Sequence, residues 1–321
     1  MSRRPEALPV GPEQFPELPL GELFFRYAAV QPFLVEDGHG VRARAAAILN
    51  PRLPGLGQIG YFACEEGPEA GRAILESACA WLAARGARTI LGPMNGAAHR
   101  PHRLMTRGFD TDPFLLGPRN PPWAPAVWES AGFAPAHRWS SYELDAGQAA
   151  ALEERLAPAI RRARRHYEAV ELDPKETATT LPRLHRLLDG AWSGHAGYAP
   201  FGLDEFAETY GPLLALLGRE NLGVIADRES GEDVALGFCY SDLLAPGATG
   251  GRTDRLVLHT VAARPGDRGL GAPYLMLAEG LRVAREHGYA RVLIALVTEE
   301  FRFFGKQLPA AREYALYGKG L

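Results

Sequence analysis

The sequence has few cysteines, no long apolar run and no large excess of one charge. Its three cysteines, Cys64, Cys79 and Cys239, are an odd number without metal-ligand spacing, which argues against a disulfide framework and a zinc site. No apolar segment is long enough to cross a bilayer, and the proline-rich start lacks the apolar core of a signal peptide. The net charge of −3 provides no bulk attraction to nucleic acid. We therefore expect a reduced, cytoplasmic protein without a metal, membrane or nucleic-acid partner.

The sequence does contain one order of elements that occurs twice. Each half shows consecutive strands, a long helix that ends at a glycine, a further strand, a short helix and a last strand. In the first half these elements are expected at residues 33–50, 58–65, 67–86, 87–94, 120–133 and 136–145. In the second half they are expected at residues 221–243, 254–263, 269–288, 290–298, 300–308 and 312–321, after two added helices at 180–194 and 203–218.

This repeat predicts an α+β protein, sandwich-like in its layers, with two tandem modules. Each module is expected to hold a mixed, mostly antiparallel sheet flanked by helices. The predicted division is an extended N-terminal segment at 1–20, a first module at 21–147, a helical connector at 148–167 and a second module at 168–321.

A glycine-rich turn, residues 264–272, follows an apolar strand of the second half. The helix that begins there offers unpaired N–H groups and a dipole that favours an anion. Gly269 and Gly271 allow close approach and positive φ, and Arg268 adds a positive charge. A tight strand-to-helix turn would need the same glycines. The G-x-x-x-x-G-K-[ST] motif is missing, and Tyr274 stands where G-x-G-x-x-G has its third glycine.

A strand, then [R/Q]-x-x-G-x-[G/A], then a helix resembles the GNAT superfamily of acyl-CoA-dependent N-acetyltransferases. The motif stands here as residues 268–273, Arg-Gly-Leu-Gly-Ala-Pro, and a proline is tolerated in the first turn of a helix. The segment from Asn120 to Phe133 resembles that family's asparagine-to-GF segment. The first half has carboxylates, in "CEEGPEAGR", where the glycine-rich turn should be. The likeness covers about residues 24–145 and 168–321 and implies a tandem GNAT protein with a degenerate N-terminal copy.

The resemblance implies acetyl-CoA or another acyl-CoA as the co-substrate and no metal. The main chain of Val261 and Ala263 would pair with the pantetheine arm. The pyrophosphate would be held by Arg268, Gly269, Leu270, Gly271 and Ala272.

An amine that attacks a thioester must lose a proton, so a base is needed. His259 lies two residues before Val261, which predicts that both side chains share one face of the strand. A histidine with its ordinary pKa of about 6.5 suits this role, and a packed sheet residue is an equal alternative. The tyrosine that often protonates the thiolate in this family is replaced by Phe303 or Phe304. Tyr314, Tyr317, water or no residue could take over.

Substrate contacts are expected from an aromatic loop, residues 192–201, which presents Trp192, His195, Tyr198 and Phe201. The loop could equally be pinned by its own aromatic rings. A second candidate wall is residues 94–110. There, His99, Arg100, His102 and Arg103 could meet an acidic substrate group or simply form an exposed polar loop.

The leading functional hypothesis is acyl transfer from acyl-CoA to the amine of a small molecule, by a monomer or homodimer. The alternatives are acetylation of a protein N-terminus or lysine, and a non-catalytic CoA-binding sensor or scaffold.

Overall fold

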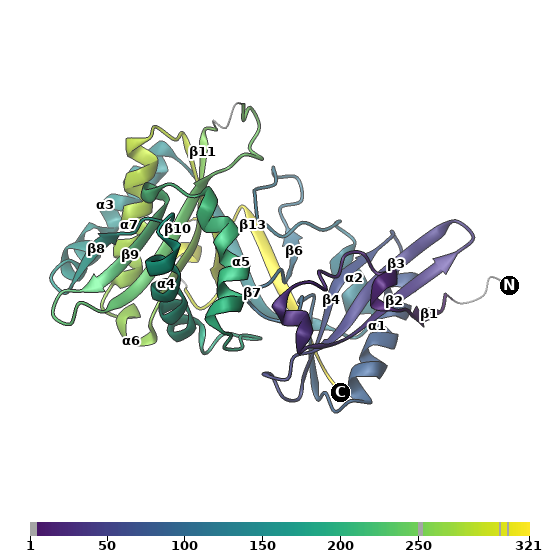
Figure 1. The fold of residues 1–321 in the computed structure, drawn as a ribbon. Helices are drawn as coiled ribbons and strands as arrows, with labels where there is room; N and C mark the ends of the chain where they lie inside the picture. The colour runs from purple at the N-terminus through teal and green to yellow at the C-terminus, as the bar shows by residue number, and fades with distance from the viewer. Residues whose placement is uncertain (1–4, 250–252, 302, 307) are drawn as a thin grey trace.

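The computed structural model describes residues 5–249, 253–301, 303–306 and 308–321, and its strands form one continuous sheet (Figure 1). This 13-stranded sheet has the order β1-β2-β3-β4-β5-β13-β7-β12-β11-β10-β9-β8, with β6 paired to β13. Pairing is antiparallel except between β4 and β5 and between β11 and β12. The predicted α+β class is confirmed, although the two expected sheets join into one.

The first half begins with β1 and two short 3-10 helices and continues through a hairpin-based sheet with two α-helices. Its elements are β1 (Ala7–Pro9), η1 (Pro12–Gln14), η2 (Leu23–Arg26), β2 (Ala29–Asp37), β3 (Gly40–Leu49), β4 (Leu56–Cys64), α1 (Pro68–Ala83), β5 (Thr89–Gly92), β6 (Leu104–Arg107), α2 (Ala124–Ser130) and β7 (Ala134–Asp145).

Helix α3 (Ala146–Ala163) connects the two halves and starts at a capping box. The main-chain N–H of Gln148 donates to Asp145 Oδ1 at 2.7 Å, and the N–H of Asp145 donates to Gln148 Oε1 at 3.0 Å. These bonds satisfy donors that a helix start leaves free.

The second half repeats the order of the first and adds two helices before its hairpin. Its elements are β8 (Tyr167–Glu171), α4 (Thr177–Trp192), α5 (Leu203–Leu216), η3 (Arg219–Asn221), β9 (Leu222–Asp227), β10 (Asp233–Ser241), β11 (Arg255–Ala263), α6 (Pro265–Arg268), α7 (Ala272–Glu286), β12 (Arg291–Thr298), η4 (Phe304–Lys306) and β13 (Arg312–Gly320). The helix predicted at 300–308 is only the short η4, and residues 302 and 307 of that prediction lie outside the described part.

The last strand of each half lies against the sheet of the other half (Figure 1). Strand β13, at the end of the chain, pairs with β5 of the first half, with Tyr317 opposite Gly92. Strand β7 pairs with β12 of the second half, with Leu144 opposite Val292. Strands β7 and β13 also pair with each other, so they form the seam at which the halves join.

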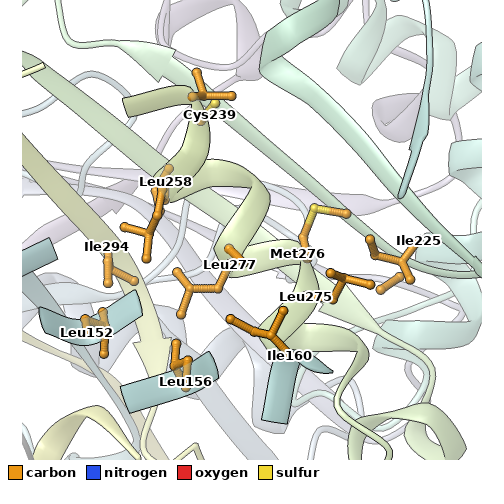
Figure 2. Packing of buried hydrophobic residues seen from close by; sticks show 14 of the residues in the cluster. Leu152, Leu156, Ile160, Ile225, Cys239, Leu258, Leu275, Met276, Leu277 and Ile294 are labelled. Atoms are coloured by element: carbon orange, nitrogen blue, oxygen red, sulfur yellow. The ribbon is translucent and has the colours of Figure 1, made fainter. Parts of the chain in front are cut away.

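Helices cover both faces of the sheet in the second half. On one face, α3 packs over α7 and α7 over the strands, and Figure 2 shows Leu156 and Ile160 facing Leu275 and Leu277 in this cluster. On the other face, α4 and α5 bury a second cluster against β10 and β11, to which Phe206 belongs. In the first half, α1 covers the matching face.

The opposite face of the first half is covered by the chain's N-terminal segment in place of α-helices. Phe15, Leu18 and Phe24 are almost completely buried and pack with Ile48 of β3. Residues 5–20 were predicted only as an extended segment, and the structure shows that they contribute to the core.

Candidate active site

The parallel strands of the second half separate where the candidate site begins. Strands β11 and β12 pair only from Arg255 opposite Arg291 to Leu258 opposite Ile294, while β11 continues to Ala263. A bulge follows directly, because Phe238 of β10 pairs with Thr260 and Cys239 pairs with Leu258. His259 is therefore the extra residue of the bulge. Beyond Leu258, β11 has no pairing with β12, and we call this unpaired stretch the open gap between the two strands.

The bulge overturns the prediction that His259 and Val261 share a face. Val261 pairs with Gly237, and a Cβ on Gly237 would lie 2.6 Å from the sulfur of Met276 in α7. The His259 ring instead stacks on Phe238, the neighbour of Gly237, with ring centroids 5.1 Å apart. Side chains alternate along a strand, so Val261 faces α7 and His259 faces the α4 and α5 side. The inserted residue reverses the simple two-residue periodicity.

His259 is held in an apolar, poorly solvated place. Its Nδ1 lies 3.0 Å from the Thr260 hydroxyl, and its Nε2 is buried without a hydrogen-bond partner. Burial, and secondly the charge of Arg103, lower the pKa of His259 from 6.5 to about 4. The ring is therefore neutral at pH 7, and its Nε2 can accept a proton if that nitrogen carries none. The expectation of an ordinary pKa is wrong because burial disfavours the charged form of the ring.

A loop of the first half reaches this site between β5 and β6. His102 Nδ1 lies 2.8 Å from the carbonyl oxygen of Arg100, and Arg103 Nη2 donates to His102 Nε2. The guanidinium of Arg103 lies 4.2 Å from the ring centroid of Trp139 in β7. His102 is kept neutral, with a pKa well below 6.5, by burial and by Arg103. The first half thus supplies part of the site of the second half.

The structure separates the two tyrosines proposed as acids. Tyr314 is buried on the α4 and α5 side, where its hydroxyl accepts a hydrogen bond from Ser141 Oγ at 3.2 Å, and the charge of Arg103 acts on it. Tyr317 lies in the core of the first half and donates to Glu129 Oε1 at 3.1 Å. Only Tyr314 therefore shares the surroundings of His259 and Arg103. Ser141 was not expected from the sequence, which carries no motif around it.

The aromatic loop is mostly core. Tyr198 and Phe201 are buried with the α4 and α5 cluster, and the Tyr198 hydroxyl donates to Asp189 Oδ1 at 2.6 Å. Trp192 and His195 are only partly buried. Burial, and secondly the charge of Arg268, lower the pKa of His195. Trp192 and His195 are therefore the members of the loop that remain open to a ligand.

The other expected wall, residues 94–110, is divided between the site and the contact between the halves. His99 stacks on Phe201 with ring centroids 3.9 Å apart and approaches Glu205 of α5. Arg100 pairs with Glu22. Glu205 itself accepts a hydrogen bond from Tyr27 at 2.8 Å, in the first half. The contacts of His99 and the bond from Tyr27 to Glu205 fasten the two halves together, whereas the Arg100 pair stays within the first half. His102 and Arg103 are left for the site.

The glycine-rich turn combines an open position and a crowded one. Gly269 has φ −70° and is exposed, with no atom within 4 Å of an added Cβ. Gly271 has φ +98° and starts α7, and an added Cβ would lie 3.2 Å from Cβ of Ala163 in α3. Helix α7 has no side-chain cap at this end. Its first N–H groups are suited to an anionic oxygen.

Arg268 has a structural task in this turn. Its Nε donates to the carbonyl oxygen of Ala263 at 3.1 Å, and its Nη2 donates to that of Ala191 at 2.9 Å. The side chain thus ties the end of β11 to the end of α4. Leu270, about half exposed, and Ala272, fully buried, have apolar side chains that cannot bind a phosphate. The turn could therefore hold a pyrophosphate only through its main-chain groups.

The matching place in the first half is filled. Only residues 65–67 separate β4 from α1, and Glu65 forms an ion pair with Arg42 at 2.7 Å. The Trp128 ring contacts Phe62 of β4 edge-on at 5.3 Å, and a Cβ on Gly92 at the end of β5 would lie 2.2 Å from it. Trp128 therefore occupies the space between the ends of β4 and β5, where the second half is open.

A pocket of about 310 Å³ lies beneath α7 on the sheet. Gly223 and Gly237 pair with each other across β9 and β10 and contribute no side chain to fill it. Its apolar lining includes Gly223, Gly237, Leu258, Val261, Met276 and Val283. The pocket lies on the α7 face, opposite the His259 ring, and reaches Val261 at the open gap.

Two further expectations can be compared with the described residues. Among them, no group of three or more histidines, cysteines or acidic residues is arranged to hold a metal ion. None of the helices in these ranges combines the length and apolar character needed to span a bilayer.

These features define the GNAT fold in a tandem arrangement. A GCN5-related N-acetyltransferase from Sphaerobacter thermophilus aligns with 90% of this chain and 80% of its own, at 15% identity and a TM-score of 0.51. A tandem GNAT protein from the clavulanic acid biosynthesis pathway aligns with 92% of this chain and 83% of its own, at 11% identity and a TM-score of 0.51. The predicted resemblance to the GNAT fold is confirmed.

The sequence itself is similar to two curated bacterial proteins. It is 29% identical over 189 residues to the bacterial ceramide synthase of Caulobacter vibrioides, which covers 55% of this chain and 47% of that protein. It is 26% identical over 178 residues to protein YghO of Escherichia coli, covering 54% and 44%. The chain thus spans about half the length of the curated relatives it matches. No protein-family model matches it.

Proposed function

We propose that this chain transfers an acyl group from acyl-CoA to the amine of a small molecule. The observation that carries the proposal is the combination, in the second half only, of an open gap between β11 and β12 and an open glycine-rich turn. Main-chain groups of residues 269–272 hold the pyrophosphate, and Val261 and Ala263 hold the pantetheine arm. His259, neutral and unpartnered at Nε2, takes the proton of the amine. Tyr314 is the candidate proton donor for the thiolate.

Gly269→Glu tests the proposed CoA site. The position accepts a side chain without backbone strain or collision, so the fold should be unaffected, while the carboxylate repels a phosphate bound at the turn. A ligand at 100 times its Kd stabilises by about 2.7 kcal/mol, so CoA should raise the Tm of the wild-type protein. We expect Gly269→Glu to abolish this rise in a thermal-shift measurement.

Gly269→Gln is the matched control, because it adds the same shape without the charge and should retain CoA binding. If the wild-type Tm does not respond to CoA, or if Gly269→Glu responds as the wild type does, the CoA site is not at this turn. Gly271 is unsuitable for this test, because any side chain there strains a left-handed backbone beneath α3. A panel of amines assayed for free thiol then separates a catalyst from a CoA-binding sensor.

The pocket beneath α7 favours a donor longer than acetyl-CoA. Apolar residues such as Leu258 and Val283 line part of it, beside charged residues such as Arg219. The pocket reaches Val261, where the pantetheine arm is proposed to lie. The name of the Caulobacter relative supports the same class of donor, because a ceramide is the fatty-acyl amide of a long-chain amine.

Gly223→Leu tests this choice of donor. A Cβ there would lie 3.4 Å from the flexible end of Met276, so the new side chain extends into the pocket without striking backbone. We expect kcat/KM with dodecanoyl-CoA to fall about tenfold, equivalent to 1.4 kcal/mol, with acetyl-CoA unaffected. Gly38→Leu, in an exposed turn of the first half, is the control. Equal losses with both donors would count against the pocket as an acyl site.

A further inference from the structure

Arg103 carries a positive charge that no acidic side chain in the described part of the chain neutralises at close range. Among the described residues, none of its nitrogens lies within 4.0 Å of a carboxylate oxygen, and the residues outside the described ranges include no aspartate or glutamate. Its Nε is buried without a hydrogen-bond partner. Its contacts are a neutral histidine, His102, and the face of Trp139. Buried charges in proteins are normally paired, since desolvation without a partner is costly.

The backbone also holds Arg103 in an unusual conformation. Its φ is +72°, in the left-handed region that non-glycine residues rarely adopt. The N–H of Arg103 donates to the carbonyl oxygen of Pro93 at 2.9 Å, and His102 forms a bridge with Met94, so the surrounding chain fixes this geometry. Strain of this kind is concentrated at ligand-binding and active sites. The loop therefore presents a charged side chain to the site in one imposed orientation.

The other groups around Arg103 are neutral or lie elsewhere. His102, His259 and Tyr314 are uncharged at pH 7. Arg268 and the exposed Glu300 act on His195 at the rim. The centre of the site thus carries the positive charge of Arg103 with neutral side chains around it.

We infer that the acceptor substrate carries an anionic group, a carboxylate or a phosphate, that binds Arg103. This inference rests on the proposed function, and it adds the class of the acceptor. An ion pair to Arg103 would fix one end of the acceptor and direct its amine toward His259, on the same face of the sheet. A guanidinium binds either oxyacid through charge-assisted hydrogen bonds.

Arg103→Gln and Arg103→Lys test the inference with paired acceptors. Alanine is compared with alaninamide for the carboxylate, and phosphoethanolamine with ethanolamine for the phosphate. The wild type should prefer one anionic member over its neutral partner by about tenfold or more in kcat/KM. Arg103→Gln should remove this preference through a higher KM for the anionic member, and Arg103→Lys should keep part of it. Arg107→Gln, at an exposed surface arginine, should behave as the wild type.

The result that overturns the inference is a wild type indifferent to acceptor charge, or an equal loss of kcat with anionic and neutral acceptors in Arg103→Gln. The second result would assign Arg103 to the reacting carbonyl. Thermal shifts with the preferred anionic acceptor, alanine or phosphoethanolamine, in the absence of CoA separate this inference from the proposed function. A shift that Arg103→Gln loses supports the anion site even if CoA fails to bind. Without ligand, Arg103→Gln should keep or raise the wild-type Tm, since a partly buried charge without an acidic partner is removed. A large loss of Tm would instead assign Arg103 a structural role through its contacts with His102 and Trp139.

Discussion

His259→Ala is expected to lower kcat/KM for acyl transfer by about 100-fold or more at pH 7, with CoA affinity unchanged. General-base catalysis contributes about 10²- to 10⁴-fold, and His259 is the histidine at the bulge where β11 leaves β12. Its ring packs on Phe238 and Tyr240, so the loss should be accompanied by only a moderate change in Tm. Steady-state kinetics with the best amine of the panel, together with a CoA thermal shift, measure both quantities.

The acidic limb of the pH profile provides a second measurement of the same residue. Burial lowers the pKa of His259 to about 4, so kcat/KM expressed per unprotonated amine should stay level from pH 7.5 to about pH 5.5. A limb near pH 6.5 would indicate a solvated histidine and contradict the role derived from this geometry. His39→Ala is the control, because His39 is exposed in the turn between β2 and β3. Activity that survives in His259→Ala would assign the proton to water or to another group.

The free energy of unfolding is expected to fall steeply below pH 6.5. Desolvation is the main cause that lowers the pKa of three histidines and keeps them neutral in the folded protein. The pKa of His99 falls to about 3, that of His259 to about 4, and that of His102 lies well below 6.5. The unfolded chain, with ordinary histidines near 6.5, binds three more protons through these side chains in this range. His195, whose pKa is also lowered, acts in the same direction. Each proton contributes about 1.4 kcal/mol per pH unit, so the three approach about 4 kcal/mol per unit.

The sign follows from the lowered pKa values. The stabilisation is fully present above pH 6.5, and it is lost as the pH falls toward the folded-state values. Total stabilities are about 5–15 kcal/mol, so unfolding should begin within one or two units below pH 6. Aspartates with a lowered pKa, such as Asp227 and Asp254, lose their stabilising charge only below about pH 4. Their contribution to the free energy of unfolding therefore changes at lower pH than that of the histidines.

Urea unfolding at pH 7.5, 6.5, 5.5 and 5.0 measures this slope. His99→Asn should reduce it by about a quarter to a third, since the proton of one of these histidines is removed. His39→Ala should leave it unchanged. A stability that is constant between pH 7.5 and 5.0 would show that these histidines are hydrated in solution.

The repeated order of strands and helices was predictable because it is local. Apolar periodicity and the glycines that end helices mark most elements, and α7 begins at Ala272 within the expected helix at 269–288. Short elements such as β6 and β8 were missed. Each has only four or five residues, and their pairing with β13 and β9 depends on distant parts of the chain.

The candidate site was predictable only in part, for the same reason. The glycine-rich turn and His259 can be recognised in the sequence. The face of the sheet to which His259 points, however, depends on a one-residue shift between β10 and β11. Arg103 and Tyr314 lie far apart in the sequence. Strand β13 brings Tyr314 opposite Trp139, over which the Arg103 guanidinium lies. No local sequence pattern predicts that Arg103 and Tyr314 lie close together.

By itself the sequence determined the tandem α+β order, the open turn that starts α7 and the exclusion of a disulfide framework, because these depend on neighbouring residues and on composition. Only the tertiary structure decided that β7 and β13 each pair with strands of the other half, and that His259 and Val261 face opposite sides of the sheet. It also decided that a loop of the first half brings the positive charge of Arg103 to the site of the second half. Strand pairing and burial act between residues far apart along the chain, so their outcome is settled only when the whole sheet has formed.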